Sequence, residues 1–198
     1  MRIAVTGKQR QVVSAFIEVG PKLGVEVFPV GRPELDLLSP KTVQPALANI
    51  RPNIIVNAAA YTAVDQAEKE PEVAMAVNAG GAMAVADAAR TLGVPLVHLS
   101  TDYVFDGSKS TPYLEQDRVA PGNVYGASKL AGEEAVTAAT RDHVIVRTAW
   151  VYSLYGKNFV QTMLTLAQSR DEVSVVADQY GRPTYTHDIA VGIVEPLL

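Results

Sequence analysis

The sequence predicts an α/β fold in which helices cover both faces of a doubly wound parallel sheet. Three observations carry this prediction. Short apolar, β-branched runs alternate with longer segments of helical periodicity along the chain. The runs are almost continuously apolar, which is typical of parallel strands that are covered on both faces. Gly7 directly follows the first run, where such folds turn tightly from strand to helix.

The elements follow in order along the chain. Strands are expected at residues 2–6, 25–30, 53–57, 95–100, 143–148 and 173–177. The longest helical segment covers residues 72–92, which are rich in alanine and include Gly80 and Gly81. These small residues suit close packing on the sheet, although helix propensity explains the alanines equally well. A last helical pattern covers residues 188–194, and no further strand follows for it to pack upon.

The composition limits the classes of partner. With 198 residues, of which 48% are hydrophobic, the chain can bury one sizeable core and begin a second domain. A net charge of -4 without a block of Lys or Arg gives no footprint for nucleic acid or an anionic membrane surface. Cysteine is absent, which excludes disulfides and thiolate chemistry. Since no apolar run suits a membrane span or a signal peptide, we expect a cytoplasmic protein.

The first turn carries one glycine where dinucleotide-binding loops usually carry three. Gly7 holds the first position of the G-x-x-G-x-x-G pattern, and Arg10 and Val13 hold the later two. A left-handed conformation at Arg10 would cost about 1–2 kcal/mol. The Arg10 guanidinium could instead pair with a phosphate. Taken alone, the loop indicates a cofactor site no more strongly than an ordinary strand-to-helix turn.

Two further segments bear on a dinucleotide. Arg32 follows the second strand, where an acidic residue would bind the ribose hydroxyls of NAD, so a cation there favours the 2′-phosphate of NADP. A solvated surface arginine is the alternative. Residues 58–60 are three alanines after the third strand, which leave room for a ligand at the sheet edge or simply pack tightly.

Tyr125 and Lys129 are four residues apart in an expected helix, so both side chains project from one face. A lysine charge about 4 Å away would lower the pKa of the phenol toward neutrality, which suits a general acid. By itself the pair is a weak signal. Thr101 and Asp102 follow the fourth strand, where a hydroxyl can bond a substrate carbonyl; closing a turn or capping nearby backbone is the alternative.

Five blocks of sequence together carry a family resemblance. They are residues 57–65 (NAAAYTAVD), 100–107 (STDYVFDG), 123–129 (NVYGASK), 147–152 (RTAWVY) and 178–184 (DQYGRPT). In this order they resemble the dTDP-4-dehydrorhamnose reductases, a family of extended short-chain dehydrogenases/reductases. The resemblance implies a Rossmann-like, NAD(P)-binding fold. It also implies reduction of the 4-keto group of dTDP-4-dehydro-L-rhamnose to dTDP-L-rhamnose in polysaccharide biosynthesis.

The resemblance implies roles for individual residues. Tyr125 would protonate the sugar carbonyl while hydride arrives from NAD(P)H, and Lys129 would also hold the nicotinamide ribose. Thr101 and Asp102 would contact the sugar, whose site Trp150 would line. The cofactor would be NADP or NAD, with NADPH favoured. Its expected contacts are Gly7, Arg10, Gln11, Val12, Arg32, Asp36, Leu37, Ala60, Tyr61, Thr62, Tyr125 and Lys129.

The resemblance also implies a division of the chain. Residues 1–150 would form the NAD(P)-binding domain, and residues 151–198 the last sheet elements and the start of a substrate-binding region. Family members continue beyond the point that corresponds to Leu198, so we expect most of the substrate domain to be absent and the nucleoside diphosphate to be held weakly. Some members use magnesium at a dimer contact. The sequence supports no metal site, and a homodimer is compatible with it.

Three other hypotheses stay open. A nucleotide-sugar epimerase or dehydratase on the same scaffold would retain a tightly bound cofactor through turnover. A non-catalytic, dinucleotide-binding regulatory subunit would need a partner protein, and the reductases do resemble the regulatory subunit of methionine adenosyltransferase. An inactive truncated form is the third hypothesis.

Overall fold

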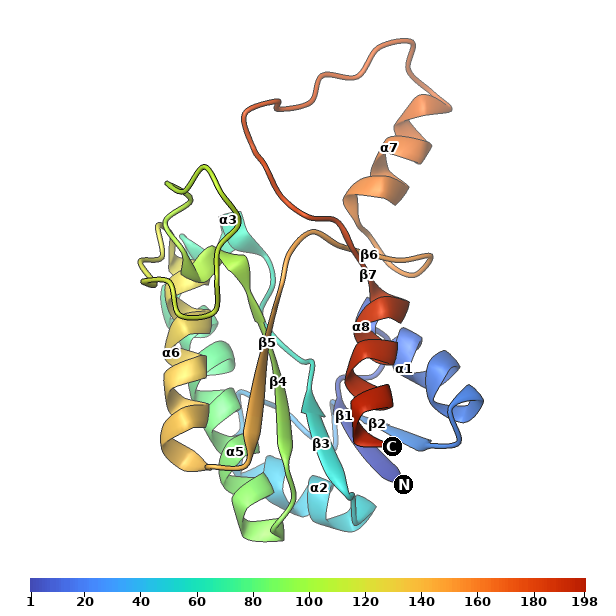
Figure 1. Ribbon diagram of the computed structural model, residues 1–198, viewed down its shortest axis with the longest axis vertical. Helices are drawn as coiled ribbons and strands as arrows, with labels where there is room; N and C mark the ends of the chain where they lie inside the picture. Colours follow the sequence, from blue (N-terminus) through green and yellow to red (C-terminus); the bar gives the residue numbers. More distant parts are fainter.

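The computed structural model describes residues 1–198 and contains the predicted doubly wound, Rossmann-like α/β fold (Figure 1). Five parallel strands form one sheet in the order β2-β1-β3-β4-β5. The strands are β1 (Arg2–Thr6), β2 (Glu26–Val30), β3 (Ile54–Asn57), β4 (Leu96–Thr101) and β5 (His143–Thr148). The strand order reverses between β1 and β3, and ligands of such sheets bind outside the carboxyl ends of the strands at this point.

Helices cover both faces of the sheet (Figure 1). One face carries α2 (Val43–Ile50), α5 (Gly81–Leu92) and α6 (Val124–Ala139), and the other carries α1 (Gln11–Lys22) and α8 (Thr186–Val194). The near-continuous apolar runs of β1, β3 and β4 are thereby explained, because these central strands are buried on both faces, whereas the edge strands β2 and β5 are partly exposed.

Two hydrophobic clusters hold these layers to the sheet. Ile3 and Val5 of β1 pack in one cluster with Phe16 of α1 and Ile193 of α8, whereas Ala4 belongs to the cluster under α2 and α5. This alternation follows from the two-residue period of a strand. Ile3, Val5 and Phe16 are fully buried, and burial of each large apolar side chain stabilises the fold by about 1.5–3 kcal/mol.

Helix α8, which no further strand follows, packs on elements from earlier in the chain. Ile189, Ala190 and Ile193 lie in the cluster with α1 and the central strands. Figure 1 shows α8 (red) beside α1 (blue). The chain thus returns to the face of the sheet that carries its first helix and contacts that helix.

The segment between β5 and α8 forms a smaller lobe. Strands β6 (Val151–Tyr152) and β7 (Thr184–Tyr185) pair in parallel, and α7 (Phe159–Ala167) stands away from the sheet (Figure 1). The strand predicted at residues 173–177 is wrong, since no strand forms there and Val176 is 70% exposed. β-branched residues favour a strand only where a neighbouring strand and a burying surface are available.

The alanine-rich stretch predicted as one helix is helical throughout but not uniform. Helix α4 (Pro71–Met75) continues through a π-helix, η2 (Ala76–Gly80), into α5. A Cβ at Gly81 would lie 2.7 Å from Cβ of Leu37, so close packing accounts for this glycine. The space around Gly80 is open, and packing does not explain it.

The remaining elements are short. They are α3 (Val64–Ala67) and the 3-10 turns η1 (Pro40–Thr42), η3 (Asp102–Val104) and η4 (Glu195–Leu197). None of the helices combines the length and the apolar character that a membrane crossing requires.

Candidate functional site

Gly7 ends β1 in a backbone conformation that favours glycine. Its φ is +105°, and its N–H donates a 2.6 Å hydrogen bond to the carbonyl of Val30 at the end of β2. A Cβ here would lie 3.1 Å from Cγ2 of Val13. Helix α1 begins four residues later, and no side chain caps its first N–H groups. Such a helix N-terminus can meet an anion.

Arg10 corrects the expectation of a strained loop. Its φ of −116° and ψ of 157° are extended values that any residue adopts. The predicted cost of a left-handed conformation therefore does not arise. The side chain is exposed and forms no salt bridge within the chain. Its guanidinium is available to a ligand at the start of α1.

The side chains of Gln11 and Val12 face the protein. Oε1 of Gln11 accepts hydrogen bonds from Oγ of Ser153 at 2.9 Å and from Nδ2 of Asn158 at 3.0 Å, which ties α1 to the smaller lobe. Val12 packs against the hydrophobic cluster around α1 and α8. The main-chain N–H groups of these two residues, not their side chains, could therefore meet a phosphate.

The predicted cofactor residues after β2 take different places. Arg32 is exposed, whereas Leu37 is buried in the cluster under α2 and α5. Oδ1 of Asp36 accepts a 3.0 Å hydrogen bond from the N–H of Leu38. Of the three predicted residues, Arg32 thus presents an exposed charge beyond β2, and Leu37 serves the core.

Thr6 organises the end of β3, a role that sequence reasoning missed. Its hydroxyl donates to Oδ1 of Asn57 at 2.7 Å and accepts from the N–H groups of Ala58 and Ala59 at 3.0 and 2.9 Å. These bonds join β1 to β3 at the switch in strand order. They fix the path of the alanine segment, whose small side chains border the carboxyl edge of the sheet. The sequence offered one sign of this role: Thr6 directly precedes Gly7.

Asn78 fixes the next part of the same loop. Its Nδ2 donates to the carbonyl of Tyr61 at 3.0 Å and to Oγ of Ser128 at 2.9 Å, and its Oδ1 accepts from the N–H of Tyr61 at 2.9 Å. The phenol of Tyr61 donates to Glu70 at 3.0 Å, and Thr62 is exposed. Asn78 therefore connects the predicted cofactor loop with α6. The sequence offered one sign of this role: Asn78 is the only asparagine in the alanine-rich residues 72–92.

Tyr125 and Thr101 meet because α6 begins close to the end of β4. Oδ1 of Asn123 accepts the N–H of Gly126 at 2.7 Å and caps the helix. A Cβ at Gly126 would lie 2.2 Å from the carbonyl oxygen of Tyr103, so glycine is required for this approach. The rings of Tyr125 and Tyr103 pack edge to face at 5.6 Å. The phenol of Tyr125 lies beside the hydroxyl of Thr101.

Burial dominates the electrostatics of Tyr125 and Lys129. It raises the pKa of the Tyr125 phenol, although the neighbouring Thr101 hydroxyl acts in the opposite direction, and it lowers the pKa of the Lys129 ammonium to about 8. Nζ of Lys129 donates a 2.7 Å hydrogen bond to the carbonyl of Leu99 on β4. The predicted lowering of the phenol pKa by the lysine does not occur in this structure: burial raises that pKa, and Lys129 is not among the groups that shift it.

The turn-capping alternative is confirmed for Thr101. Its Oγ1 accepts the N–H of Tyr103 at 3.2 Å and so caps η3. The same hydroxyl lies 3.2 Å from Oδ1 of Asp102 and neighbours the phenol of Tyr125. Burial raises the pKa of the Asp102 carboxyl. The end of β4 thus brings a hydroxyl, a carboxyl and a phenol together.

Trp150 follows β5 in a strained conformation. Its φ of +46° lies in the left-handed region, which is uncommon for a residue with a large side chain. Its indole packs on Gly181, where a Cβ would lie 2.4 Å from Cε2, and the N–H of Thr184 donates to its carbonyl at 3.2 Å. Since Thr148 is the register partner of Thr101, Trp150 lies beyond the same edge of the sheet.

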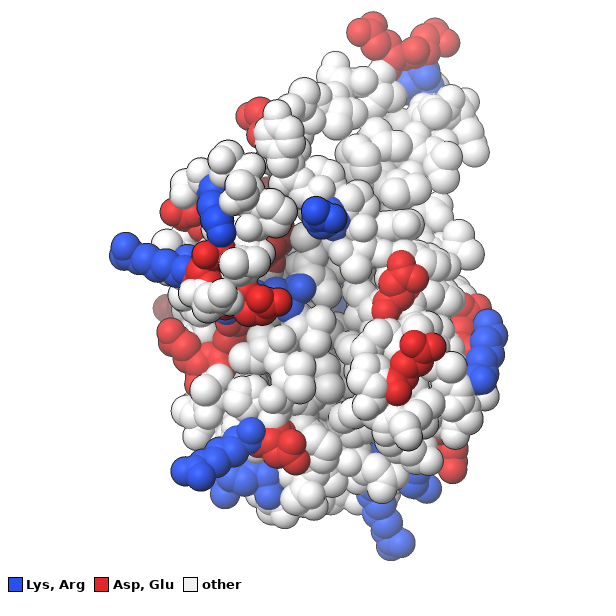
Figure 2. Space-filling model, in the orientation of Figure 1, with Lys and Arg blue, Asp and Glu red and all other residues white.

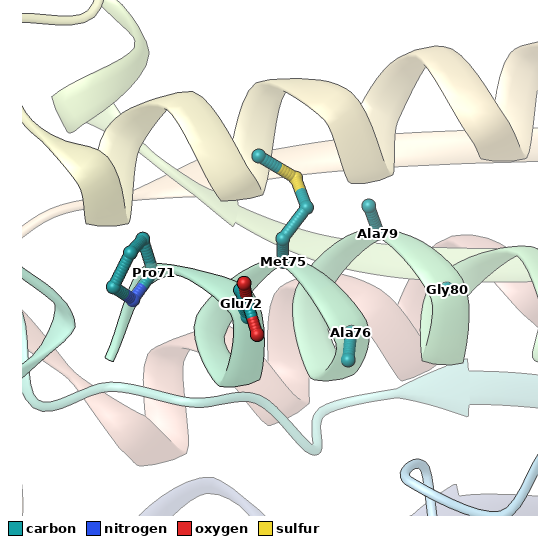
Figure 3. A pocket seen from close by; sticks show the side chains of 6 residues that line it. All are labelled: Pro71, Glu72, Met75, Ala76, Ala79 and Gly80. Carbon is teal, nitrogen blue, oxygen red and sulfur yellow. The ribbon is translucent and has the colours of Figure 1, made fainter.

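A shallow apolar groove lies outside this constellation. It has a volume of about 570 Å³ and is lined by Pro71, Glu72, Met75, Ala76, Ala79 and Gly80. Figure 3 shows Met75 and Ala79 on the side of their helix that faces α6. None of the predicted site residues lines this groove.

The charged side chains form no cluster that could bind a metal ion. Figure 2 shows Lys, Arg, Asp and Glu interspersed over the face in view. No group of three or more His, Asp or Glu side chains lies close enough to hold a metal ion.

The candidate site consists of the ends of β1, β3 and β4, the start of α6 and the residues that follow β5.

Comparison with known proteins gives a matching family and close relatives. The family model described as the RmlD substrate binding domain matches residues 1–197. A dTDP-4-dehydrorhamnose reductase of Sinorhizobium fredii is 54% identical over 194 residues, which cover 98% of this chain and 65% of the relative. One of Burkholderia thailandensis is 46% identical over 197 residues, which cover 100% and 66%. The chain thus spans about two thirds of the length of these relatives.

A solved structure agrees closely with the fold. The crystal structure of dTDP-4-dehydrorhamnose reductase from Bacillus anthracis, in complex with NADP, has a TM-score of 0.95 to this chain at 44% sequence identity. The match covers 99% of this chain and 70% of that one.

Proposed function

This chain belongs to the dTDP-4-dehydrorhamnose reductase family, and from that premise we propose that it serves the NAD(P)H-dependent reduction of a 4-keto nucleotide sugar. The substrate is dTDP-4-dehydro-L-rhamnose and the product is dTDP-L-rhamnose, for polysaccharide biosynthesis. One observation carries the proposal: the start of α6 brings Tyr125 beside Thr101 at the carboxyl end of β4, and Lys129, one helical turn later, is bonded to the carbonyl of Leu99 on the same strand.

Reduction of a carbonyl needs a hydride at carbon and a proton at oxygen. The nicotinamide cofactor supplies the hydride when it is bound. Tyr125 donates its phenolic proton to the sugar oxygen, and the hydroxyl of Thr101 hydrogen-bonds the same oxygen. Because burial raises the pKa of Tyr125, the phenol stays protonated at neutral pH, as a proton donor must. The ammonium of Lys129 stabilises the phenolate that remains and holds the nicotinamide ribose.

The substrate proposal extends to two neighbours of this pair. Asp102 contacts the sugar from the end of β4, next to Thr101. Trp150, which is 45% exposed, lines the sugar site with its indole. Its strained backbone supports this role, since strain of this kind clusters at functional sites.

The ends of β1 and β3 fit a dinucleotide. The left-handed turn at Gly7 and the uncapped start of α1 form a cradle for the pyrophosphate. The main-chain N–H groups of Arg10, Gln11 and Val12 meet its oxygens there, and the guanidinium of Arg10 adds a charge-assisted partner.

The rest of the cofactor lies along the same edge of the sheet. Arg32 binds the 2′-phosphate and thereby favours NADPH over NADH. Asp36 and the main chain of the buried Leu37 would adjoin the adenine. Ala60, Tyr61 and Thr62 lie along the cofactor after β3. Under this proposal residues 1–150 form the cofactor-binding domain and residues 151–198 begin the substrate-binding region, with α8 packed back on the first. A cytoplasmic location completes the proposal, since the reaction consumes NADPH.

The test follows NADPH oxidation with dTDP-4-dehydro-L-rhamnose in the parent and in Tyr125→Phe. We expect Tyr125→Phe to lower kcat by roughly 10²–10⁴-fold, because general acid catalysis contributes that much, while the dissociation constant for NADPH stays within about twofold. Tyr180→Phe is the matched control, since this phenol is 95% exposed. Equal turnover in parent and Tyr125→Phe contradicts the assigned role. Tightly held NAD in the purified parent indicates an epimerase or dehydratase instead.

A further inference from the structure

A buried ion pair lies beneath the proposed catalytic face of α6. Glu133 is 5% exposed and follows Lys129 by one helical turn. Arg147 of β5 binds both carboxylate oxygens, Nε to Oε1 at 2.9 Å and Nη2 to Oε2 at 2.6 Å. Oγ of Ser100 on β4 donates to Oε1 at 2.5 Å. This carboxylate is therefore held by two strands in a bidentate arrangement that allows little rotation.

The partners of Glu133 adjoin the proposed site. Ser100 directly precedes Thr101 and is the register partner of Arg147. Lys129 stands four residues before Glu133, on the same side of α6. The carboxylate thus joins the helix that carries the lysine to the strand end that carries the threonine.

The same pair also reaches the loop between β4 and α6. Nη1 of Arg147 donates to the carbonyl of Glu115 at 3.3 Å, and its guanidinium lies over the ring of Phe105 at 5.0 Å. Phe105 stacks on Tyr113 with 4.2 Å between the ring centroids. The loop that leads from Asp102 to the start of α6 is therefore anchored on the arginine that holds Glu133.

Stability alone does not account for this pair. Replacing a buried ion pair by apolar residues of similar volume is often neutral or stabilising, because the desolvation of two charges offsets their attraction. An apolar contact between α6 and β5 would hold the layers equally well. A precise, directional contact at this point therefore suggests a role in placing the residues around it.

Glu133 is also the carboxylate whose charge favours the protonated form of Lys129. Burial lowers the pKa of Lys129, and the Glu133 charge acts in the opposite direction. His98 of β4 faces Lys129 too, but burial lowers its pKa to about 3, so it is neutral near pH 7. The other titratable groups on elements packed against α6 are exposed or contact other partners: Asp65, Glu72, Asp87, Arg90, Asp102, Tyr103, His143 and Arg147.

We propose that Glu133, held by Arg147 and Ser100, is a positioning residue that sets Lys129 beside Tyr125 and Thr101 at the end of β4. Glu133 touches neither substrate nor cofactor and acts through its neighbours. The effect on turnover rests on the function proposed above. The effect on Lys129 itself can be measured without any turnover.

The experiment follows the titration of the Lys129 side chain by NMR, with Lys129→Met to assign its signal. Glu133→Gln removes the charge and keeps the shape of the side chain. We expect the pKa of Lys129 to fall below its value of about 8 in the parent. Glu134→Gln is the matched control, because Glu134 is the next residue on α6 and is exposed. It leaves the titration of Lys129 unchanged.

A second variant guards against loss of the fold. Glu133→Gln leaves Arg147 partly buried without a charged partner, which can unfold the chain. The double variant Glu133→Met/Arg147→Met replaces both charges by apolar side chains and keeps the packing. It also lowers the pKa of Lys129. In both variants the alkaline limb of the kcat profile moves to lower pH, and kcat at pH 8 falls by roughly tenfold while the KM for the sugar changes by less than about twofold.

The outcomes separate this inference from the proposed function. A titration of Lys129 that is the same in the folded variants and in the parent overturns the inference, even where the parent reduces the sugar. A shifted titration in a chain that does not reduce the sugar supports the positioning of Lys129 and rejects the proposed function. A shifted titration with a shifted alkaline limb supports both.

Discussion

The sheet with its helices and the lobe between β5 and α8 bury apolar side chains to very different extents. Phe16 of α1 is fully buried, whereas Phe159 at the start of α7 is 60% exposed and Leu164 on the same helix is 57% exposed. No residue of α7 is buried. In Figure 1 this helix stands apart from the layers that enclose the sheet. A helix forms in both regions, but its apolar residues are covered only where a second layer packs on it.

The largest expected effect comes from replacing one phenylalanine in each region by alanine and comparing the free energies of unfolding. We expect Phe16→Ala to lower the free energy of unfolding by about 3–5 kcal/mol, because it leaves a cavity in the cluster with Ile3 and Ile193. Phe159→Ala should change it by no more than about 0.5 kcal/mol, as for other exposed positions. Urea unfolding followed by circular dichroism measures both. Equal losses in the two variants would show that α7 contributes to the same cooperative core.

A second prediction uses the buried polar layer of the sheet region. Burial lowers the pKa of His98 from 6.5 to about 3. The unfolded chain therefore binds a proton between these two values that the folded chain does not bind. This contribution to stability is complete above pH 6.5 and is lost as the pH falls, by about 1.4 kcal/mol per pH unit. Stability curves measured between pH 6.5 and pH 5 should show this slope.

His98→Gln isolates the contribution of this imidazole. Nδ1 of His98 accepts a 3.0 Å hydrogen bond from Nδ2 of Asn57, which a glutamine oxygen can accept instead. The variant should lose most of the slope below pH 6.5, whereas His143→Gln, at a less buried position, should keep it. A slope that persists in His98→Gln assigns the acid sensitivity to other groups.

The smallest expected effect concerns the first turn. Because Arg10 is extended, Arg10→Gly relieves no backbone strain and should not tighten NADPH binding. We expect binding to weaken by about threefold to tenfold, the loss of one exposed charge-assisted bond to phosphate. Calorimetric titration of both chains with NADPH decides the matter. Tighter binding by the variant would mean that the Arg10 side chain obstructs the pyrophosphate.

Features carried by neighbouring residues were predictable from the sequence. Five of the six expected strands form, with bounds within one residue of the prediction. The i,i+4 spacing placed Tyr125 and Lys129 on one face of α6, and the position of Gly7 marked the first turn. The blocks of sequence that carry the family resemblance identified the family, which the matching family model and relatives confirm. Each of these signals lies within one element or one short block.

Features that join distant residues were not predictable in this way. The bond between Gln11 and Asn158 spans 147 residues, and the pair of Glu133 and Arg147 joins a helix to a neighbouring strand. The strand expected at residues 173–177 failed for the related reason that its β-branched residues have no strand beside them. A single run of residues carries no record of such partners.

The sequence by itself determined the alternation of strands and helices, the order of the candidate site residues and the family. Periodicity, turn residues and ordered blocks are local properties, and they survive without knowledge of what lies across the core. Only the tertiary structure decided that Arg10 is unstrained, that α8 returns to α1, and that burial raises the pKa of Tyr125 and lowers that of Lys129. Those properties depend on desolvation and on contacts between residues far apart in the chain, which exist only once the layers have packed.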